Sequence, residues 1–330
     1  MRRTTIGRLE VSVLGVGCNS FGTDFFGNRC TQADVDRIVG TALDAGINLF
    51  DTAEEYSVTS FLGEGHSEEM LGIALRNRRD EAVIASKWSN YDEAHPDQKG
   101  AARIIAACEA SLQRLGVDHL DLYQQHQQEH AVPMEEILTA LDTLVQQGKV
   151  REVGCCNLPA AMLDEAAAIA DRTGVAPYRS LQVQYSVLER PADDVLVAAE
   201  RHGLPLLAYF PLASGVLTGK YKPGEPPPAD SRFGAGGQVA ALLQTGIMSR
   251  RPLLSDERLA TVAELALFAE SRGHALLDLA LSYLAGDPRV GSVLTGVTRP
   301  GQVTANAAAI GWEMTAADRR AADEIVAREA

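Results

Sequence analysis

Short apolar runs and segments with helical periodicity alternate along most of the chain. The helical segments repeat apolar residues at three- and four-residue spacing, whereas the apolar runs have the length of buried strands. The first six predicted helices cover residues 31–45, 67–77, 101–115, 134–147, 160–172 and 192–201. The predicted strands cover residues 13–17, 48–50, 82–86, 120–125, 150–154, 180–184, 205–209 and 291–294.

This alternation predicts a parallel sheet covered by helices. Eight strands favour a closed (β/α)₈ barrel, or TIM barrel, which needs ~250 residues and leaves room for insertions in a chain of 330. A short β-hairpin is expected within residues 6–16. Extra helices are expected toward the C-terminus, at residues 256–271, 275–285, 300–310 and 315–327.

An open doubly wound sheet is the alternative to the barrel. Its dinucleotide fingerprint is incomplete, because Ser20 stands where a third glycine should follow Gly15 and Gly17. Lysine does not follow Gly22, so this stretch is not a P-loop either. The chain shows no shift to a linker composition, and we expect residues 1–330 to form one domain.

The longest irregular stretch covers residues 222–252 and contains three consecutive prolines from Pro226 to Pro228. Long loops without secondary structure in compact domains usually serve as lids or binding loops. We therefore expect this segment to fold over the mouth of the barrel, where it would help to set substrate specificity together with residues 92–99.

Composition narrows the classes of partner. The formal net charge of -14 repels polyanions, which argues against nucleic acid and anionic membranes as main partners. The five cysteines form no CxxC pair, so a reducing, cytoplasmic setting is expected. Met1-Arg2-Arg3 is not followed by a signal-peptide core, and no run approaches ~18 apolar residues. Composition leaves open whether the chain forms a homo-oligomer.

Four polar residues lie at or just after the carboxyl ends of successive predicted strands. Asp51 follows the strand at 48–50 and Tyr56 comes shortly after it, Lys87 follows the strand at 82–86, and His126 follows the strand at 120–125. Taken singly, each could be a turn cap, a rim residue or half of a surface ion pair. Because strand ends of a parallel barrel share one rim, their joint occurrence predicts an active site there.

These four side chains suit proton transfer to a carbonyl oxygen. A phenol has a pKa of ~10, so tyrosine can exchange a proton near neutrality only beside a positive charge. Lys87 could supply that charge, since two charges ~4 Å apart at an effective dielectric of about 20 interact by ~4 kcal/mol, or roughly three pKa units. Asp51 would hold the lysine in place, and neutral His126 would donate a hydrogen bond that orients the carbonyl.

A zinc site is the competing explanation for one motif. His126-Gln-Gln-Glu129-His130 matches the HxxEH pattern of inverted zinc peptidases. That chemistry needs both histidines on one face of a helix, whereas this run directly follows a predicted strand and ends at Pro133. We therefore expect no metal in this site.

The motifs together resemble the aldo-keto reductase superfamily, in its bacterial branch of long-loop members. The resemblance rests on Asn48-Leu-Phe-Asp51-Thr-Ala-Glu-Glu-Tyr56, Ala85-Ser-Lys87, Asp121-Leu-Tyr-Gln-Gln-His126, Gly148-Lys-Val-Arg-Glu-Val-Gly154 and Gln182-Val-Gln-Tyr185-Ser. It implies a catalytic tetrad of Asp51, Tyr56, Lys87 and His126. It also implies reduction of an aldehyde or ketone, sugar-derived carbonyls included, by hydride transfer with tyrosine as general acid.

The resemblance further implies a nicotinamide cofactor held without a Rossmann fold. Asn157 and Gln182 would hold the carboxamide, Tyr209 would stack on the nicotinamide ring, and Arg299 or Thr298 would lie near a 2′-phosphate. A guanidinium fits phosphate bidentately, which favours NADPH over NADH. The other implied cofactor contacts are Gly17, Cys18, Asn19, Asp51, Cys156, Phe210, Pro211, Leu212, Gly215, Lys220, Gly296, Gln302 and Asn306.

The expected substrate pocket is formed by Trp88, Tyr56 and His126, with Phe25, Phe26 and Tyr91 as further candidates. Three positions depart from the family pattern: Cys156 replaces a usual serine, Phe210 follows Tyr209 in place of serine, and Thr298 stands where relatives are often basic. The alternative function is a cofactor-binding regulatory subunit that resembles potassium channel beta subunits.

Overall fold

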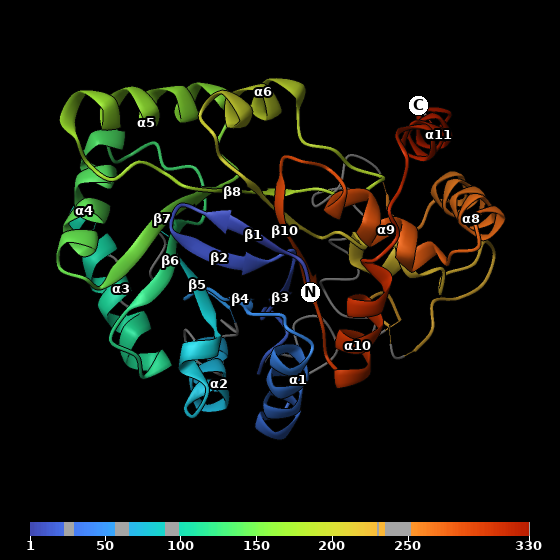
Figure 1. Cartoon of the computed structure of the whole chain (residues 1–330), viewed down its shortest axis with the longest axis horizontal. Coiled ribbons are helices and arrows are strands. Elements are labelled where there is room, and N and C mark those ends of the chain that lie inside the picture. The colour runs from blue at the N-terminus through green and yellow to red at the C-terminus, as the bar shows by residue number, and fades with distance from the viewer. Residues whose placement is uncertain (23–29, 57–65, 90–98, 230, 235–251, 330) are drawn as a thin grey trace.

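Eight parallel strands close into a barrel in the computed structural model of the chain (Figure 1). The structure describes residues 1–22, 30–56, 66–89, 99–229, 231–234 and 252–329. Around the barrel the strand order is β10-β3-β4-β5-β6-β7-β8-β9. The strands are β3 (Leu14–Gly17), β4 (Leu49–Asp51), β5 (Val83–Trp88), β6 (Leu120–Gln125), β7 (Val150–Cys156), β8 (Leu181–Gln184), β9 (Leu206–Tyr209) and β10 (Val290–Gly296).

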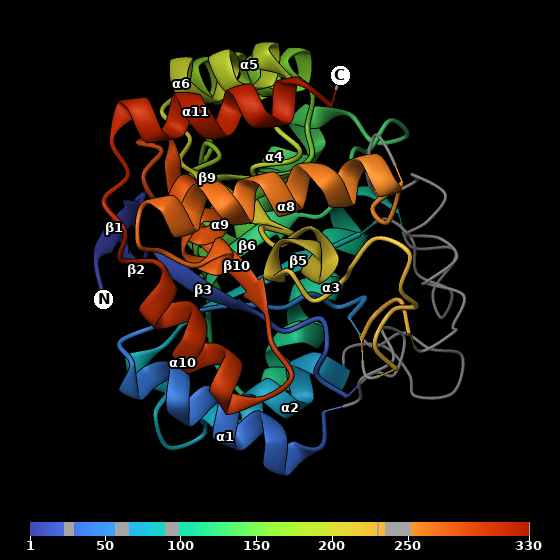
Figure 2. The same ribbon diagram turned by 90° about the vertical axis from the view of Figure 1, so that its right-hand side faces the viewer.

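Helices surround the barrel and bury its outer face (Figures 1 and 2). Those that follow the strands in turn are α1 (Gln32–Asp44), α2 (His66–Leu75), α3 (Gly100–Leu115), α4 (Met134–Gln146), α5 (Ala160–Thr173) and α6 (Asp193–Arg201). Toward the C-terminus come α8 (Asp256–Ser271), α9 (Leu276–Ala285), α10 (Pro300–Ala309) and α11 (Ala316–Ala327). Two short 3₁₀ helices are η1 (Arg79–Glu81) and η2 (Ala213–Thr218).

The predicted (β/α)₈ barrel is confirmed, and the differences lie at the ends of elements. The N-terminal hairpin starts earlier than expected, with β1 at Arg3–Ile6 and β2 at Leu9–Ser12. Strands β7 and β10 each run two residues beyond their predicted ends. They do so because parallel pairing continues there, between Cys156 and Gln182 and between Gly296 and Gly17. The neighbouring strands therefore keep these last residues in the barrel.

The hairpin closes the amino-terminal end of the barrel. Its side chains Ile6, Leu9 and Val11 join one buried cluster with the interior residues Leu49, Val83, Ala85, Leu122, Leu207 and Leu294. The hairpin turns at Gly7, whose φ of +55° favours glycine and whose missing Cβ makes room for the carboxylate of Glu152. The floor of the barrel is therefore packed with aliphatic side chains, and the open end lies at the opposite rim.

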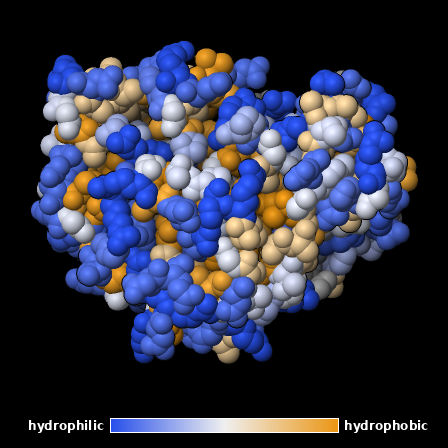
Figure 3. Space-filling view, in the orientation of Figure 1, coloured by the Kyte–Doolittle hydropathy of each residue, from blue (hydrophilic) through white to orange (hydrophobic). Residues whose placement is uncertain are grey.

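Hydrophilic residues cover much of the hairpin side of the molecule, with hydrophobic residues scattered among them (Figure 3). This distribution is ordinary for a protein surface, since apolar atoms always contribute part of it. Among the residues that the structure describes, none of the helices has both the length and the apolar character needed to cross a membrane.

Alanine substitutions at two helical glycines are expected to change the free energy of unfolding in opposite directions. A Cβ on Gly72 of α2 would lie 2.2 Å from the Leu115 carbonyl oxygen at the end of α3, whereas a Cβ on Gly40 of α1 meets nothing within 4 Å. We expect Gly72→Ala to lower the free energy of unfolding by ~1–3 kcal/mol through overpacking. Gly40→Ala should raise it by ~0.5–1 kcal/mol, because alanine is the better helix former. Urea titration of both variants checks this, and equal effects would contradict it.

Candidate active site

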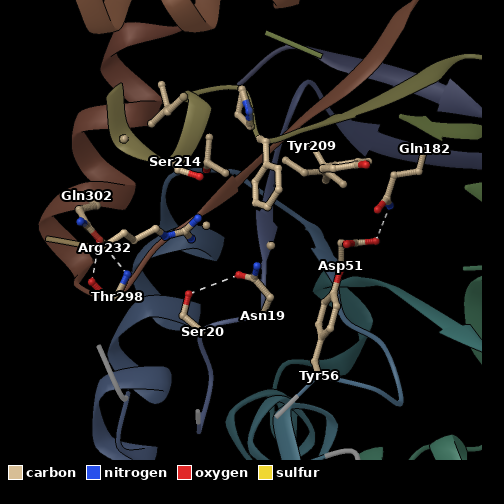
Figure 4. A pocket seen from close by; sticks show the side chains of 18 of the residues that line it. Asn19, Ser20, Asp51, Tyr56, Gln182, Tyr209, Ser214, Arg232, Thr298 and Gln302 are labelled. Carbon is tan, nitrogen blue, oxygen red and sulfur yellow. Dashed lines mark hydrogen bonds between the residues drawn. The ribbon is translucent and has the colours of Figure 1, made fainter. Parts of the chain in front are cut away.

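A cavity of about 1250 Å³ lies at the carboxyl ends of the barrel strands. Gly17, Asp51, Tyr209 and Gly296, which end strands β3, β4, β9 and β10, all line it, as does Gln182 of β8. Figure 4 shows that side chains from these different strands point into one space, with Asp51, Tyr56 and Gln182 at one side and Arg232, Thr298 and Gln302 at the other. The cavity is thus elongated between a carboxylate-containing end and a cationic end.

The ammonium group of Lys87 is the centre of the polar network at the first end. Lys87 is fully buried, and its Nζ donates to Asp51 Oδ2 at 2.7 Å, to the Thr52 carbonyl oxygen at 2.8 Å and to the Tyr56 hydroxyl at 3.0 Å. These contacts use the three donors of an ammonium group. The strand β5 therefore delivers a buried, fully hydrogen-bonded cation directly behind the phenol.

Asp51 is held from both sides by charged and amide donors. Its Oδ2 accepts from Lys87, and its Oδ1 accepts from Gln182 Nε2 at 2.8 Å and from Gln124 Nε2 at 3.2 Å. Figure 4 shows the contact between Gln182 and Asp51. A buried carboxylate is stable only when paired and hydrogen-bonded, and this network supplies Asp51 with both a cation and amide donors.

The segment that carries Tyr56 is anchored to its neighbours. The Thr52 hydroxyl lies 3.0 Å from the Ser67 hydroxyl, and Ser67 donates to the Cys18 carbonyl oxygen at 2.8 Å. Glu54 Oε1 accepts from the Ser89 amide and from Arg103 Nη2, each at 2.7 Å. These buried contacts fix the chain just before Tyr56, so the phenol is positioned by the scaffold.

The charges around Tyr56 act in opposite directions. Burial raises the pKa of Tyr56 and is the largest influence, Lys87 lowers it, and Asp51 raises it, so the net pKa lies above the ordinary value. Burial alone would lower the pKa of Lys87, but Asp51 and Tyr56 raise it, so the lysine stays charged. The expectation that Lys87 makes the phenol acidic needs correction, because Asp51 offsets the ammonium charge and burial favours the neutral phenol.

His126 reaches the same wall from the end of β6. Its backbone amide donates to the Trp88 carbonyl oxygen at 3.0 Å, and its ring lies edge-on to Tyr56 with the ring centroids 5.9 Å apart. Its Nδ1 lies 3.1 Å from Glu55 Oε2. The four residues named as a tetrad are therefore brought together at one end of the cavity.

Strained backbone lines part of the cavity. Asn157, Phe210 and Ser214 have φ values of 56°, 53° and 58°, which residues other than glycine rarely adopt. The Tyr209 hydroxyl donates to Asn157 Oδ1 at 3.0 Å, which joins β9 to the segment after β7. Such strain persists only where the surroundings impose it, and it is concentrated here at the cavity wall.

The far end of the cavity combines a helix N-terminus with cationic side chains. Thr298, Arg299, Gly301 and Gln302 at the start of α10 line it, and Gln302 Oε1 accepts from the Thr298 amide at 2.7 Å and the Arg299 amide at 3.2 Å. The helix N-terminus carries a partial positive charge.

The long segment after β9 adds two more cations to this end. The guanidinium of Arg232 lies near Gly296, where a Cβ would come within 3.4 Å of its Nη2, and burial lowers its pKa. The Lys220 ammonium lies against Gly215, where a Cβ would come within 3.0 Å of Nζ. This end of the cavity is therefore suited to anions.

Most residues predicted for the site lie where the sequence placed them. Besides Tyr56, His126 and Asp51, the cavity is lined by Gly17, Asn19, Asn157, Gln182, Tyr209, Phe210, Pro211, Leu212, Gly215, Lys220, Gly296, Thr298, Arg299 and Gln302. Lys87, Cys18, Cys156 and Asn306 are buried behind its wall and do not line it. Trp88 packs in the hydrophobic core with 1% of its surface exposed, and it does not line the cavity either.

Some expectations fall outside the described residues. Phe25, Phe26, Tyr91, most of residues 92–99 and residues 235–251 of the long segment all lie there. The described part of the long segment reaches the cavity through Arg232. Residues 126–130 form an irregular segment rather than the helix that the zinc pattern requires, and within the described residues no group of three or more His, Cys, Asp or Glu could hold a metal.

Several lining residues were not identified from the sequence. They are Ser20, Glu55, Gln127, Gln128, Ser214, Thr218, Arg232, Leu294, Thr295 and Gly301. Two of them could have been predicted from the sequence. Arg232 is a basic residue in the segment expected to cover the mouth, and Glu55 directly precedes the predicted catalytic tyrosine. The others adjoin predicted residues and follow from the path of the chain.

Comparison with known proteins agrees with this geometry. The model of the aldo/keto reductase family matches residues 13–327. A probable voltage-gated potassium channel subunit beta from Arabidopsis thaliana is 34% identical over 92% of this chain and 90% of its own length. The aldo-keto reductase YhdN of Bacillus subtilis is 30% identical over 94% of this chain and 89% of its own.

A third relative is the L-glyceraldehyde 3-phosphate reductase of Escherichia coli, which is 32% identical over 83% of this chain and 78% of its own length. The family match spans nearly the whole chain, and two of these relatives are named as reductases. The chain therefore belongs to the aldo/keto reductase family, and it is an oxidoreductase of the nicotinamide-dependent kind.

Proposed function

We propose that the protein reduces an aldehyde or ketone, such as a sugar-derived carbonyl, to an alcohol with NADPH, and that Tyr56 is the general acid. The observation that carries this proposal is the contact set of Lys87, whose Nζ lies 2.7 Å from Asp51, 2.8 Å from the Thr52 carbonyl oxygen and 3.0 Å from the Tyr56 hydroxyl. A buried ammonium group directly behind a phenol at a cavity wall is suited to proton transfer.

The lining residues fit a dinucleotide. The cavity volume of about 1250 Å³ exceeds that of most small-molecule sites, and its cations Lys220, Arg232 and Arg299 stand out in a chain of net charge -14. Asn157, Gln182 and Tyr209 would hold the nicotinamide end, and the start of α10 would hold the phosphate end. Reduced nicotinamide supplies a hydride to the carbonyl carbon when it is bound.

The residues of this chain then handle the proton. Tyr56 donates its hydroxyl proton to the carbonyl oxygen as negative charge develops there, and its raised pKa keeps that proton in place beforehand. Lys87 lies 3.0 Å from the phenolate so formed and stabilises it, while Asp51 holds the ammonium in position. His126 would orient the carbonyl from the other side.

A carbonyl screen tests the proposal. Aldehydes and ketones of varied size are offered with NADPH and NADH side by side, and cofactor oxidation is followed at each. We expect turnover with several carbonyls, faster with NADPH. Tyr56→Phe serves as the control, because it keeps the ring and removes the proton. Turnover that is equally fast in this variant would overturn the role of Tyr56.

Arg299 is expected to favour NADPH over NADH. A guanidinium pairs with a phosphate bidentately, so we expect Arg299→Gln to raise the KM for NADPH about tenfold and to leave the KM for NADH unchanged. Arg37→Gln on α1 is a matched control, since the Arg37 side chain is 67% exposed and Arg37 does not line the cavity. Equal effects of Arg299→Gln on both cofactors would contradict the assignment.

A cofactor-binding regulatory subunit is the second candidate, and the relative named as a probable potassium channel subunit beta favours it. Both functions need the cofactor, but only the reductase needs rapid turnover. Tight NADPH binding without oxidation across the whole carbonyl panel would favour the regulatory subunit. The complete tetrad supports the reductase.

A further inference from the structure

Glu55 lies beside the histidine of the tetrad. Its Oε2 is 3.1 Å from Nδ1 of His126, and both residues line the cavity next to Tyr56. The contact is largely shielded from solvent, because the Glu55 side chain is 29% exposed and that of His126 is 16% exposed. The two atoms are at ion-pair distance without the alignment of a straight hydrogen bond, so the contact is ionic when the ring is protonated.

This contact influences which nitrogen of the imidazole ring carries a proton. A carboxylate facing Nδ1 favours a proton on Nδ1, which is buried, and leaves Nε2 as the nitrogen that can meet a ligand. A neutral ring with its proton on Nδ1 can only accept at Nε2. His126 can therefore face Glu55 and also donate to a carbonyl oxygen only when both nitrogens carry protons.

The charges around the ring leave Glu55 as its natural counter-ion. Asp51 is paired with Lys87 at 2.7 Å, and Glu54 is paired with Arg103 at 2.7 Å. Tyr56 contributes a neutral phenol, whose ring lies edge-on to His126. Burial would raise the pKa of Glu55, but the contact with His126, with help from Ser89 and Lys87, lowers it below the ordinary value, so Glu55 is a carboxylate near neutrality.

We propose that Glu55 is a positioning residue that holds His126 as an imidazolium, with Nδ1 facing the carboxylate and Nε2 facing the cavity. The substrate carbonyl then accepts a hydrogen bond from a cationic donor rather than from a neutral imidazole. Charge-assisted hydrogen bonds are roughly twice as strong as neutral ones, and this donor would polarise the carbonyl for hydride attack. The proposal rests on the proposed reduction for the identity of the acceptor.

The sign of the expected pH dependence follows from this arrangement. If the imidazolium is the active form, kcat/KM falls as pH rises through its titration. Removing the carboxylate removes a charge that favours the protonated ring, so in Glu55→Gln the fall begins at lower pH than in the wild type. Glu55→Asp keeps the charge and should restore most of the wild-type profile.

Nitrogen-15 NMR of histidine-labelled protein measures the ring directly. The full chain is titrated with saturating NADP⁺, and the signal of His126 among the seven histidines is assigned with His126→Gln. We expect both ring nitrogens of wild-type His126 to be protonated near neutrality, and Glu55→Gln to lose this form at lower pH. Melting temperatures of the variants establish that each is folded, and Glu55→Ala, which also removes the charge, replaces Glu55→Gln if the latter is not.

Two results would overturn the proposal. One is a wild-type His126 that is neutral with its proton on Nε2 under these conditions. The other is a titration, and a kcat/KM profile, that Glu55→Gln leaves unchanged. Because the NMR measurement needs no turnover, a protein that reduces no carbonyl but shows the Glu55-dependent imidazolium would refute the proposed function and retain this inference.

Discussion

Replacing Tyr56 by phenylalanine is expected to lower kcat/KM for carbonyl reduction by ~10²–10⁴, the range that a positioned general acid contributes. The hydroxyl is 3.0 Å from Lys87 Nζ, in a part-buried contact at the cavity wall, and phenylalanine has no proton to donate from that position. The ring, the cavity and the cations at its far end remain. The affinity for NADPH, measured by fluorescence titration, should therefore change by less than about threefold.

A conservative variant elsewhere in the wall serves as the comparison. Tyr209→Phe removes a hydroxyl that donates to Asn157 at 3.0 Å, far from any role in proton donation. We expect it to affect cofactor binding more than the chemical step. If Tyr56→Phe instead weakens NADPH binding and leaves kcat intact, the phenol serves binding and the assignment of the general acid is wrong.

Replacing Lys87 by methionine should both unfold the protein more easily and stop its activity. The side chain is fully buried and forms an ion pair of 2.7 Å with Asp51, so its removal leaves a buried carboxylate without its cation. Such a loss costs ~3–5 kcal/mol of unfolding free energy. In the proposed mechanism the same substitution removes the group that stabilises the Tyr56 phenolate, so we expect kcat to fall by a factor comparable to that of Tyr56→Phe.

A double-mutant cycle with Asp51→Asn separates the two effects. If the pair acts as a unit, the double variant Lys87→Met with Asp51→Asn should be clearly more stable than the sum of the single losses, because no unpaired charge stays buried. Activity should remain lost in the double variant, since the ammonium group is still missing. Urea titration and turnover of the four proteins provide the cycle, and strict additivity of the unfolding free energies would contradict the pairing.

The barrel and the meeting of Asp51, Lys87 and His126 at one rim could be predicted because both depend on strand periodicity. Asp51 ends β4, Lys87 lies near the end of β5 and His126 follows β6. A closed parallel barrel therefore brings them to one rim, independently of the conformation of the loops. Trp88 illustrates the same rule in reverse. Successive strand residues face opposite sides, so a Lys87 that points toward the interior places Trp88 toward the helices, where it packs in the core.

Other parts of the site could not be predicted in this way. Arg232 reaches the cavity from an irregular segment that has no strand register to fix its direction. The contact of Glu55 with His126 depends on the local turn of the chain before Tyr56, which hydrophobic patterning does not encode. The pKa of Tyr56 depended on how burial balances Asp51 against Lys87, and that balance needs coordinates.

The aliphatic side chains of Ile6, Leu9 and Val11 fill the amino-terminal end of the barrel, and this limits how ligands can enter and leave. Because that end is closed, substrates and products must enter and leave by the same rim, so a product has to dissociate before the next substrate can bind. Substitutions in the segments around the rim can therefore change substrate selectivity and the rate of product release, while Asp51, Tyr56, Lys87 and His126 stay unchanged.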